Sequence, residues 1–298
     1  MARPLPLSTR LAAAAAALGL AAAAVAAPAM SAAAIATPAA GSDVVWTHNP
    51  ASPRGPAAWG KLDPQWAACG SGVDQSPVVV TGTQSARLPA LRIDYPRTPL
   101  VVENTGHVVE VPQPPTGGSL TVGDHRYQLV QWHVHAPAEH VVAGHRADLE
   151  IHLVHSDAQG NTAVVAVFAD LARSPRPAGP HSAAALLRTT LRAAPERAGE
   201  ETAVGKDVSA AQLLETAGKP ARSGRTVSDY LTYRGSLTTP PCTTGATWFL
   251  LPDSVRVDAD TVTRLHRLIA SFPAYGGYPD NNRPVQPLCS RTVLRRAG

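Results

Sequence analysis

The sequence predicts a mixed α/β, β-dominated fold with a single domain. Three observations favour this class: glycine and proline are frequent, at 23 and 28 of 298 residues, short apolar runs alternate with polar residues, and strong helical periodicity is scarce. With 44% hydrophobic residues, the chain is too apolar for a disordered protein. It carries no internal repeat, no P-loop and no GxGxxG motif.

The expected elements follow from the apolar runs. Short runs rich in valine predict strands at Val78–Val80, Val101–Val102, Val108–Val111, Tyr127–His135, Asp148–Val154, Ala163–Phe168 and Trp248–Leu251. The stretch 173–225 mixes Ala, Leu, Pro and Arg and predicts a surface excursion with helices near Ser182–Ala193 and Ser209–Ala217. A third helix is expected at Ala259–Ala270, because four aliphatic residues fall on one of its faces.

The N-terminus has the pattern of a secretory signal. Arg3 and Arg10 precede a charge-free run, and small-x-small triplets such as Ala24-Val25-Ala26 follow. We expect a signal peptide at residues 1–27, an Ala/Pro spacer at 28–43 and the folded domain at 44–298. A membrane anchor is the alternative, but about 17 weakly apolar residues are marginal for a span. The protein is therefore predicted to be exported, either secreted or periplasmic and cell-envelope associated, with no stable membrane span after cleavage.

The net charge of the mature domain argues against two classes of partner, nucleic acid and acidic membrane surfaces. Removing residues 1–27 takes away two arginines and no acid, which lowers the formal net charge from +4 to +2. A nearly neutral domain gives no reason to expect nucleic acid or an acidic membrane surface as a partner. The chain alone leaves a monomer and a homodimer equally open.

Three cysteines in an exported chain predict one disulfide and one remainder. Cys69, Cys242 and Cys289 allow three pairings, and spacing does not choose between them. A bond from Cys69 to Cys242 would close a long loop worth about 5 kcal/mol on the chain-entropy account.

Histidines concentrate in one stretch: six of the 11 lie between His133 and His155. Side chains alternate along a strand, so Gln131, His133 and His135 share one face of their strand. Glu150 and His152 share a face of the next predicted strand, which offers a third imidazole. Three neutral imidazoles leave zinc one open position, as in a catalytic site.

Gln131 and Glu150 are placed to fix the second ring nitrogen of two ligating imidazoles.

The remaining histidines have simpler interpretations. His140 and His155 are expected to be hydrogen-bonded structural residues. Surface positions are expected for a further set: His48, His125, His145, His181 and His266.

Seven motifs in order resemble the α-class carbonic anhydrases, from about Trp59 to Arg291. They are Gln75-Ser76-Pro77, Asn104-Thr105-Gly106-His107, Gln131-Trp132-His133-Val134-His135, Ala138-Glu139-His140, Glu150-Ile151-His152-Leu153-Val154-His155, Tyr233-Arg234-Gly235-Ser236-Leu237-Thr238-Thr239-Pro240-Pro241-Cys242 and Asn282-Arg283-Pro284-Val285-Gln286-Pro287. The resemblance implies a large, mostly antiparallel twisted sheet with short peripheral helices and a conical cavity ending at zinc. It also implies a lyase that hydrates CO2 to bicarbonate and a proton through zinc-bound hydroxide.

The resemblance assigns roles to the catalytic positions. His133, His135 and His152 look like the zinc ligands. Thr238 resembles the hydroxyl that accepts a hydrogen bond from the hydroxide and donates one to Glu139. His107 matches the proton shuttle, and its ordinary pKa near 6.5 suits that task.

The substrate positions follow from the same resemblance. Val154, Val164, Leu237 and Trp248 resemble the apolar wall where CO2 rests, and Thr239 would lie near bicarbonate. Cys69 and Cys242 match the disulfide of exported members, and sulfonamides and anions are the expected inhibitors.

Some positions depart from the family pattern. Trp46-Thr47-His48 aligns loosely with Trp-x-Tyr, so His48 stands where a tyrosine is usual. Thr105 replaces a common asparagine, Glu110 would line the cavity, and Cys289 has no assignable partner. These departures bear on the proton-transfer rate and the inhibitor profile, not on the zinc-hydroxide step.

Two alternative functions fit parts of the sequence. His133-x-His135-x-x-x-Glu139 also resembles the first metal motif of cupins, but the residues before His152 lack the expected Pro-x-Gly turn. A catalytically weak or silent carbonic-anhydrase-like binding module is the second alternative. Such relatives usually lose a zinc histidine, and all three are present here.

Overall fold

Strands dominate the structure, a computed structural model that describes residues 1, 44–71, 73–173, 179–215 and 223–296. The fifteen strands are β1 (Val79–Val80), β2 (Gln84–Ala86), β3 (Leu91–Asp94), β4 (Thr98–Asn104), β5 (Val109–Pro112), β6 (Ser119–Val122), β7 (His125–His135), β8 (Val141–Val142), β9 (Leu149–Ser156), β10 (Thr162–Leu171), β11 (Glu200–Val208), β12 (Arg225–Val227), β13 (Leu231–Ser236), β14 (Thr244–Val257) and β15 (Leu294–Arg296). The helices are short: α1 (Trp59–Leu62), η1 (Pro64–Trp66), α2 (Ala68–Ser71), α3 (Ala183–Ala193), η2 (Ala210–Leu214) and α4 (Ala259–Ala270).

One sheet organises this architecture. It has 13 strands, with a main path in the order β11-β4-β5-β7-β9-β10-β14-β13-β15-β2, and β3, β6 and β12 branch from it. Its pairs are antiparallel except β10 with β14 and β15 with β2. A separate two-stranded parallel sheet joins β1 to β8. The predicted fold class, with a large, mostly antiparallel sheet and few short helices, is confirmed.

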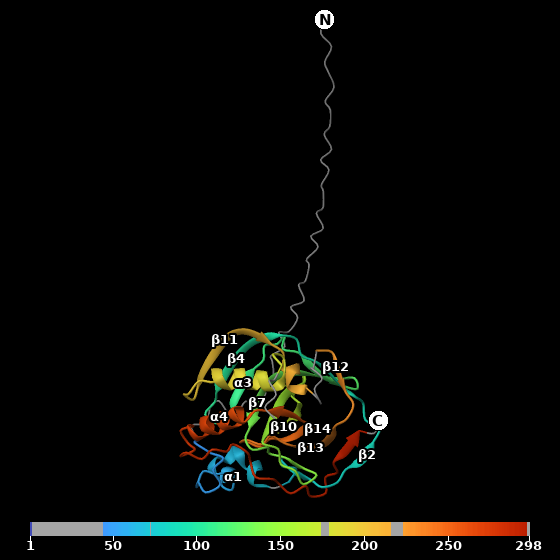
Figure 1. Ribbon diagram of the computed structural model, residues 1–298. Helices are drawn as coiled ribbons and strands as arrows, with labels where there is room; N and C mark the ends of the chain where they lie inside the picture. The colour runs from blue at the N-terminus through green and yellow to red at the C-terminus, as the bar shows by residue number, and fades with distance from the viewer. Residues whose placement is uncertain (2–43, 72, 174–178, 216–222, 297–298) are drawn as a thin grey trace. The chain divides into compact units, whose positions relative to one another are not determined.

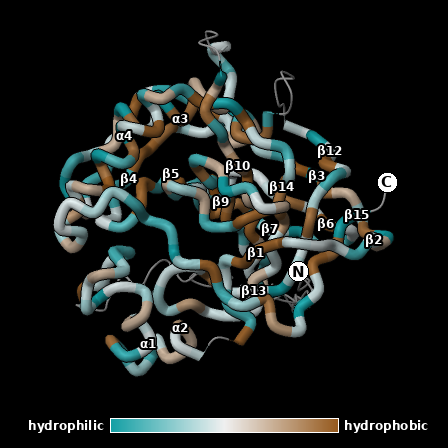
Figure 2. Tube along the Cα trace, turned by 60° about the horizontal axis from the view of Figure 1, so that its bottom comes forward, coloured by the Kyte–Doolittle hydropathy of each residue, from teal (hydrophilic) through white to brown (hydrophobic). Residues whose placement is uncertain are grey.

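Helices α3 and α4 cover one face of the sheet (Figure 1). Each begins at a residue whose side chain accepts a hydrogen bond from the first turn: Ser182 from the amide of Ala185, and Asp258 from the amide of Thr261. Their apolar faces pack on strand residues such as Val134 and Ile151 in one core. Figure 2 shows brown apolar residues recurring along the central strands.

The opposite face is only partly apolar. A second core cluster on this side gathers residues of β10, β13 and β14, including Val164, Tyr233 and Trp248. The same face of β7 and β9 carries His133, which lies opposite His152. The sheet therefore separates a sealed core from a polar face.

A third cluster holds the N-terminal segment against the sheet. Trp46, Trp59 and Trp66 pack around the disulfide between Cys69 and Cys242. Of the three possible pairings, this is the one that the resemblance implied, and Cys289 is free and exposed.

Buried Arg283 ties this cluster to the C-terminal segment. Its guanidinium donates to the carbonyl oxygens of Cys69 at 3.0 Å and Ser76 at 2.8 Å, and to Oε1 of Gln75 at 2.8 Å. A cation buried this deeply is tolerated because its donors find oxygen partners.

Most predicted elements are present, and the exceptions fall in one region. All seven predicted strands lie within or overlap observed ones, and the helices at 182–193 and 259–270 are confirmed. The helix expected at Ser209–Ala217 is a 3-10 helix, Ala210–Leu214, and residues 216–217 fall outside the described chain. The expectation of a helical surface excursion also missed β11, which pairs with β4 at the sheet edge.

The predicted signal peptide and spacer, residues 1–27 and 28–43, lie outside the described residues apart from Met1. Within the described chain, no helix is long and apolar enough to cross a membrane.

Candidate metal centre and active-site cavity

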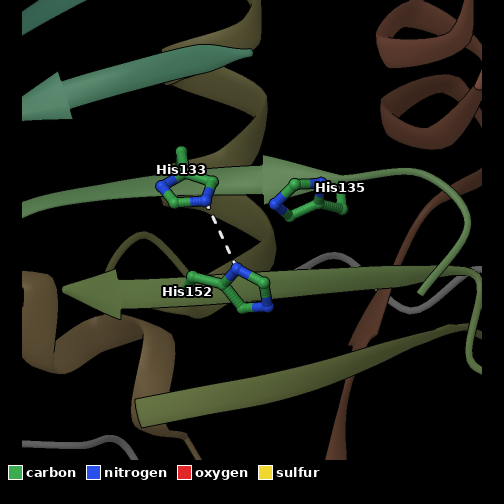
Figure 3. Close-up of side chains that lie close together, drawn as sticks. All are labelled: His133, His135 and His152. Carbon is green, nitrogen blue, oxygen red and sulfur yellow. Dashed lines mark hydrogen bonds between the residues drawn. The ribbon is translucent and has the colours of Figure 1, made fainter. Parts of the chain in front are cut away.

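Three imidazoles meet on the polar face of the sheet. Period-two alternation turns His133 and His135 of β7 to the same side, and the register of β7 with β9 sets His152 directly opposite His133. One ring nitrogen of each residue lies within 4.8 Å of the other two. Figure 3 shows the three rings on these neighbouring strands.

The second nitrogen of each ring is held by an oxygen. His133 Nδ1 donates to Oε1 of Gln131 at 2.8 Å, and His152 Nε2 donates to Oε1 of Glu150 at 2.8 Å. These are the two acceptors that the strand periodicity indicated. Such bonds fix both the tautomer and the orientation of an imidazole.

The third acceptor could not be found from the sequence. His135 Nδ1 donates to the backbone carbonyl of Asn281 at 2.8 Å, across 146 residues. The Asn281 side chain also fixes the local backbone, because its Oδ1 accepts from the amide of Ala136 at 2.8 Å. A backbone carbonyl carries no residue-type signal, and only the tertiary fold brings it to His135.

The remaining nitrogens fit a metal ion. His133 Nε2 and His152 Nδ1 face each other at 3.3 Å, and His135 Nε2 has no hydrogen-bond partner within the described chain. Burial lowers the pKa of all three rings, that of His135 to about 4, so they are neutral at neutral pH. Neutral imidazole is the form that binds metal, and three such ligands suit a catalytic zinc site.

Glu150 anchors a buried network behind the imidazoles. Its carboxylate accepts from His152 and from Nδ1 of His140 at 2.7 Å, as well as from the amides of Glu139 and His140 at 2.8 Å. Burial alone would raise the pKa of Glu150, but His140 and His152 lower it well below its ordinary value. Tyr233 donates to Nε2 of His140 at 2.6 Å, which confirms His140 as a hydrogen-bonded structural residue.

Glu139 lies beneath the imidazoles. Its Oε1 accepts from the amide of Arg283 at 2.7 Å, and its Oε2 lies 3.7 Å from Nε2 of His135. Burial raises the pKa of Glu139 to about 7, against the opposing effects of His152, the Arg283 amide and the Thr238 hydroxyl. The structure therefore brings Thr238 and Glu139 together beside the metal centre.

A narrow cavity of about 50 Å³ opens in front of this centre. All six predicted substrate and shuttle positions line it: His107, Val154, Val164, Leu237, Thr239 and Trp248. Gln131, His133, His152 and Thr238 line it as well. Glu110 lines the same cavity, as its position suggested. Burial, and secondarily the Glu103 carboxylate, raise the pKa of Glu110 to about 7.

His107 is presented by a tight turn. Gly106 adopts a positive φ of 83°, and its amide donates to Oδ1 of Asn104 at 2.8 Å. The His107 ring stacks on Trp46, with 3.7 Å between ring centroids and 8° between planes. Burial lowers the pKa of this ring to about 4.

The surface prediction for His48 is wrong. The residue is 1% exposed, its Nδ1 lies 2.5 Å from the Tyr275 hydroxyl, and its ring centroid is 6.4 Å from that of His135. Burial, followed by the charges of neighbouring histidines, lowers its pKa well below 6.5. Trp46, Trp59 and Tyr275 enclose the ring. No hydrophobic periodicity around His48 predicts this burial, because the contacts are tertiary.

Comparison with known proteins gives the same assignment. Residues 54–297 match the family described as eukaryotic-type carbonic anhydrase. The chain belongs to the α-carbonic anhydrase family. Because α-carbonic anhydrases are zinc enzymes that hydrate CO2, this membership excludes the cupin alternative and makes the chain an enzyme of the carbonic anhydrase type.

Individual relatives cover most of the chain. A carbonic anhydrase of Neisseria gonorrhoeae is 33% identical over 239 residues, which span 80% of this chain and 84% of the relative. Dioscorin DB3L of Dioscorea polystachya is 32% identical over 246 residues, spanning 82% and 83%. The α-carbonic anhydrase of Thermovibrio ammonificans, solved with the inhibitor sulfanilamide, superposes with a TM-score of 0.70 at 29% identity, covering 85% of this chain and 100% of that one.

Proposed function

We propose that this chain catalyses the reversible hydration of CO2 to bicarbonate and a proton, with zinc held by His133, His135 and His152. The observation that carries the proposal is the set of three neutral imidazoles, two buried and one partly exposed, each with one nitrogen tied to an oxygen and the other turned to a common point. Zinc held in this way supplies a Lewis acid that makes water nucleophilic near neutral pH, an effect for which carbonic anhydrase is the reference case.

Apolar side chains receive CO2. The substrate is neutral and offers no charge to bind, so a wall that excludes competing water is the appropriate surface. Val154, Val164 and Trp248 are each at most 4% exposed, and with Leu237 they line the cavity next to His152. Thr239 lines the same cavity, which supports a role in contacting bicarbonate.

Thr238 and Glu139 orient the attacking water. A threonine hydroxyl that donates its one hydrogen bond to a carboxylate has only lone pairs left. It can therefore accept a hydrogen bond but cannot donate a second one. The attacking oxygen then directs its proton to Thr238 and its lone pair to CO2. The Arg283 amide keeps the Glu139 carboxylate in place for this task.

His107 carries the proton away from the cavity. While the ring is stacked on Trp46, its pKa of about 4 favours release of a proton over capture. Capture therefore requires the ring to turn toward cavity water, where the pKa of an imidazole returns toward 6.5. At low buffer concentration, His107→Ala should slow turnover, and added imidazole should restore it; an unaffected rate without rescue removes His107 from the mechanism.

Export and inhibition complete the proposal. The basic and apolar N-terminal pattern, the small-residue triplets and the Cys69–Cys242 disulfide support a protein that works outside the cytoplasm. Sulfonamides and small anions are proposed inhibitors, because a relative is solved with sulfanilamide and the cavity leads directly to the imidazoles.

The test is stopped-flow CO2 hydration on the purified protein together with metal analysis. We expect one zinc per chain and rapid hydration in the wild type, and loss of both in His135→Ala. His125→Ala is the matched control, because this exposed histidine lies on the same strand but pairs with Asp157. Background activity with one zinc bound, or full activity in His135→Ala, contradicts the proposal and favours a silent binding module.

A further inference from the structure

Five side chains form a single row across five neighbouring strands. The register pairs Glu201 with Glu103, Glu103 with Glu110, Glu110 with His133, and His133 with His152. Residues directly opposite each other in antiparallel strands point to the same face of a sheet. The row therefore runs on the polar face from the edge strand β11 to the metal centre.

Exposure falls steadily along this row. Glu201 is exposed, Glu103 is partly exposed, and Glu110 is only 5% exposed at the wall of the cavity. Neighbouring strands lie about 4.8 Å apart, so the three steps from Glu201 to His133 span about 14 Å. Carboxylates thus connect the surface of the molecule with the imidazoles.

The innermost carboxylate is unpaired among the described residues. Glu110 is 5% exposed and lies opposite His133, and its side chain makes no hydrogen bond or ion pair in this part of the chain. An unpaired buried carboxylate costs stability, and like charges directly opposite in a sheet repel each other. The row of carboxylates is therefore unfavourable by itself, and a bound cation would offset its repulsion.

We propose that Glu201, Glu103 and Glu110 form an entry track that attracts a divalent metal ion at the sheet edge and guides it to the three imidazoles. The proposal rests on the proposed function, because the metal centre is the destination of the ion. Aligned negative charge raises the local concentration of cations and the rate of association. Carboxylate oxygens also bind Zn²⁺ directly, so Glu110 can hold the ion before the imidazoles do.

The test measures metal uptake and not turnover. Metal-free protein, prepared with a chelator, is mixed at pH 8 with Co²⁺, whose visible absorption reports binding, and with Zn²⁺ in competition with a chromogenic chelator. At low ionic strength, Glu110→Gln should slow association about threefold to tenfold, and Glu103→Gln should slow it less. The difference should shrink at high salt, because salt screens steering.

Two variants control for charge and for structure. Asp124→Asn removes an exposed acid in the turn before β7, nine residues and about 30 Å along the strand from His133, and should leave association unchanged. Glu110→Asp keeps the charge and should stay near the wild-type rate. If Glu110→Gln does not fold, the partly exposed Glu103 carries the test through Glu103→Gln.

The outcomes separate the two proposals. Wild-type protein that takes up no Co²⁺, or His135→Ala that takes it up equally, defeats the metal centre itself. Normal uptake by the wild type with unchanged association in Glu110→Gln defeats only the entry track. The track is also wrong if Glu110→Gln changes dissociation alone, or if Asp124→Asn slows association as much.

Discussion

Neighbouring residues along strands β7 and β9 point in turn to two different environments, a sealed apolar core on one face of the sheet and a polar cavity on the other. Trp132, Val134 and Ile151 point into the sealed core under α3 and α4, whereas His133 and His152 point toward the cavity. Replacing a residue of the first set costs packing, whereas the rings of the second set turn one nitrogen each toward a common point shared with His135. Stability and chemistry are thus assigned to different faces, and substitutions on each face should separate them.

The largest loss of catalytic activity is expected from His152→Ala, on the cavity face of the sheet. Loss of one of three proposed zinc ligands should lower kcat/KM for CO2 hydration by at least about a thousandfold. The free energy of unfolding of the metal-free protein should change less than it does for a core substitution in the same strand. Stopped-flow hydration and denaturant titration measure the two quantities, and retained activity would contradict the assignment.

The neighbouring substitution Ile151→Ala tests the other face. Ile151 is fully buried in the main core, so truncation should lower the free energy of unfolding by about 2–5 kcal/mol. At 15 °C, where the variant is still folded, kcat/KM should stay within about twofold of the wild type. An activity loss comparable to that of His152→Ala would show that the faces are coupled.

A smaller effect is expected from Gln131→Ala. The substitution removes the acceptor that holds Nδ1 of His133, so the dissociation constant of zinc should rise about 10- to 100-fold. Gln128→Ala on the same strand is the control, because within the described residues the side-chain amide of Gln128 has no hydrogen-bond partner. Competition with a chelator gives both constants, and equal affinities in the two variants would remove Gln131 from the metal centre.

The last substitution tests how stability depends on pH. His155 lies on the core face, where Tyr95 donates to its Nε2 at 2.6 Å, and burial lowers its pKa to about 4. Between pH 6.5 and 4 the unfolded chain binds a proton that the folded chain excludes, so the free energy of unfolding falls as pH falls through this window. His155→Gln keeps an acceptor for Tyr95 but does not titrate.

The slope of stability against pH should therefore decrease by up to about 1.4 kcal/mol per pH unit in His155→Gln. Denaturant titrations of both metal-free proteins between pH 4.5 and 7 measure the slope of the free energy of unfolding against pH. The other buried histidines contribute equally to both proteins, so parallel curves would show that His155 does not exclude the proton.

Alternation along strands was enough to predict much of the site. It set Gln131, His133 and His135 on one face and Glu150 with His152 on another, and the structure has both sets as expected. These relations are local, since the backbone imposes a period of two whatever the tertiary context. The fold class was predictable from the short apolar runs, the frequent glycine and proline and the scarcity of helical periodicity.

Features that depend on tertiary contacts were not predictable. Strand β11 was missed because eight of its nine residues are at least partly exposed, so no apolar alternation marks it. His48 was placed on the surface because the aromatic residues that bury it are remote in sequence or lack a local pattern. Asn281 contributes a backbone carbonyl to His135, and any residue type could supply that atom.

The contacts of Asn281 and Arg283 set an order of events during synthesis. His135 needs a hydrogen-bond acceptor that lies 146 residues further along the chain, and Arg283 donates a hydrogen bond to Gln75 across 208 residues. Contacts between such distant residues form late, because loop closure must come first. A growing chain thus displays its histidine cluster well before His135 is oriented, and tight metal capture becomes available only after Asn281 has been made.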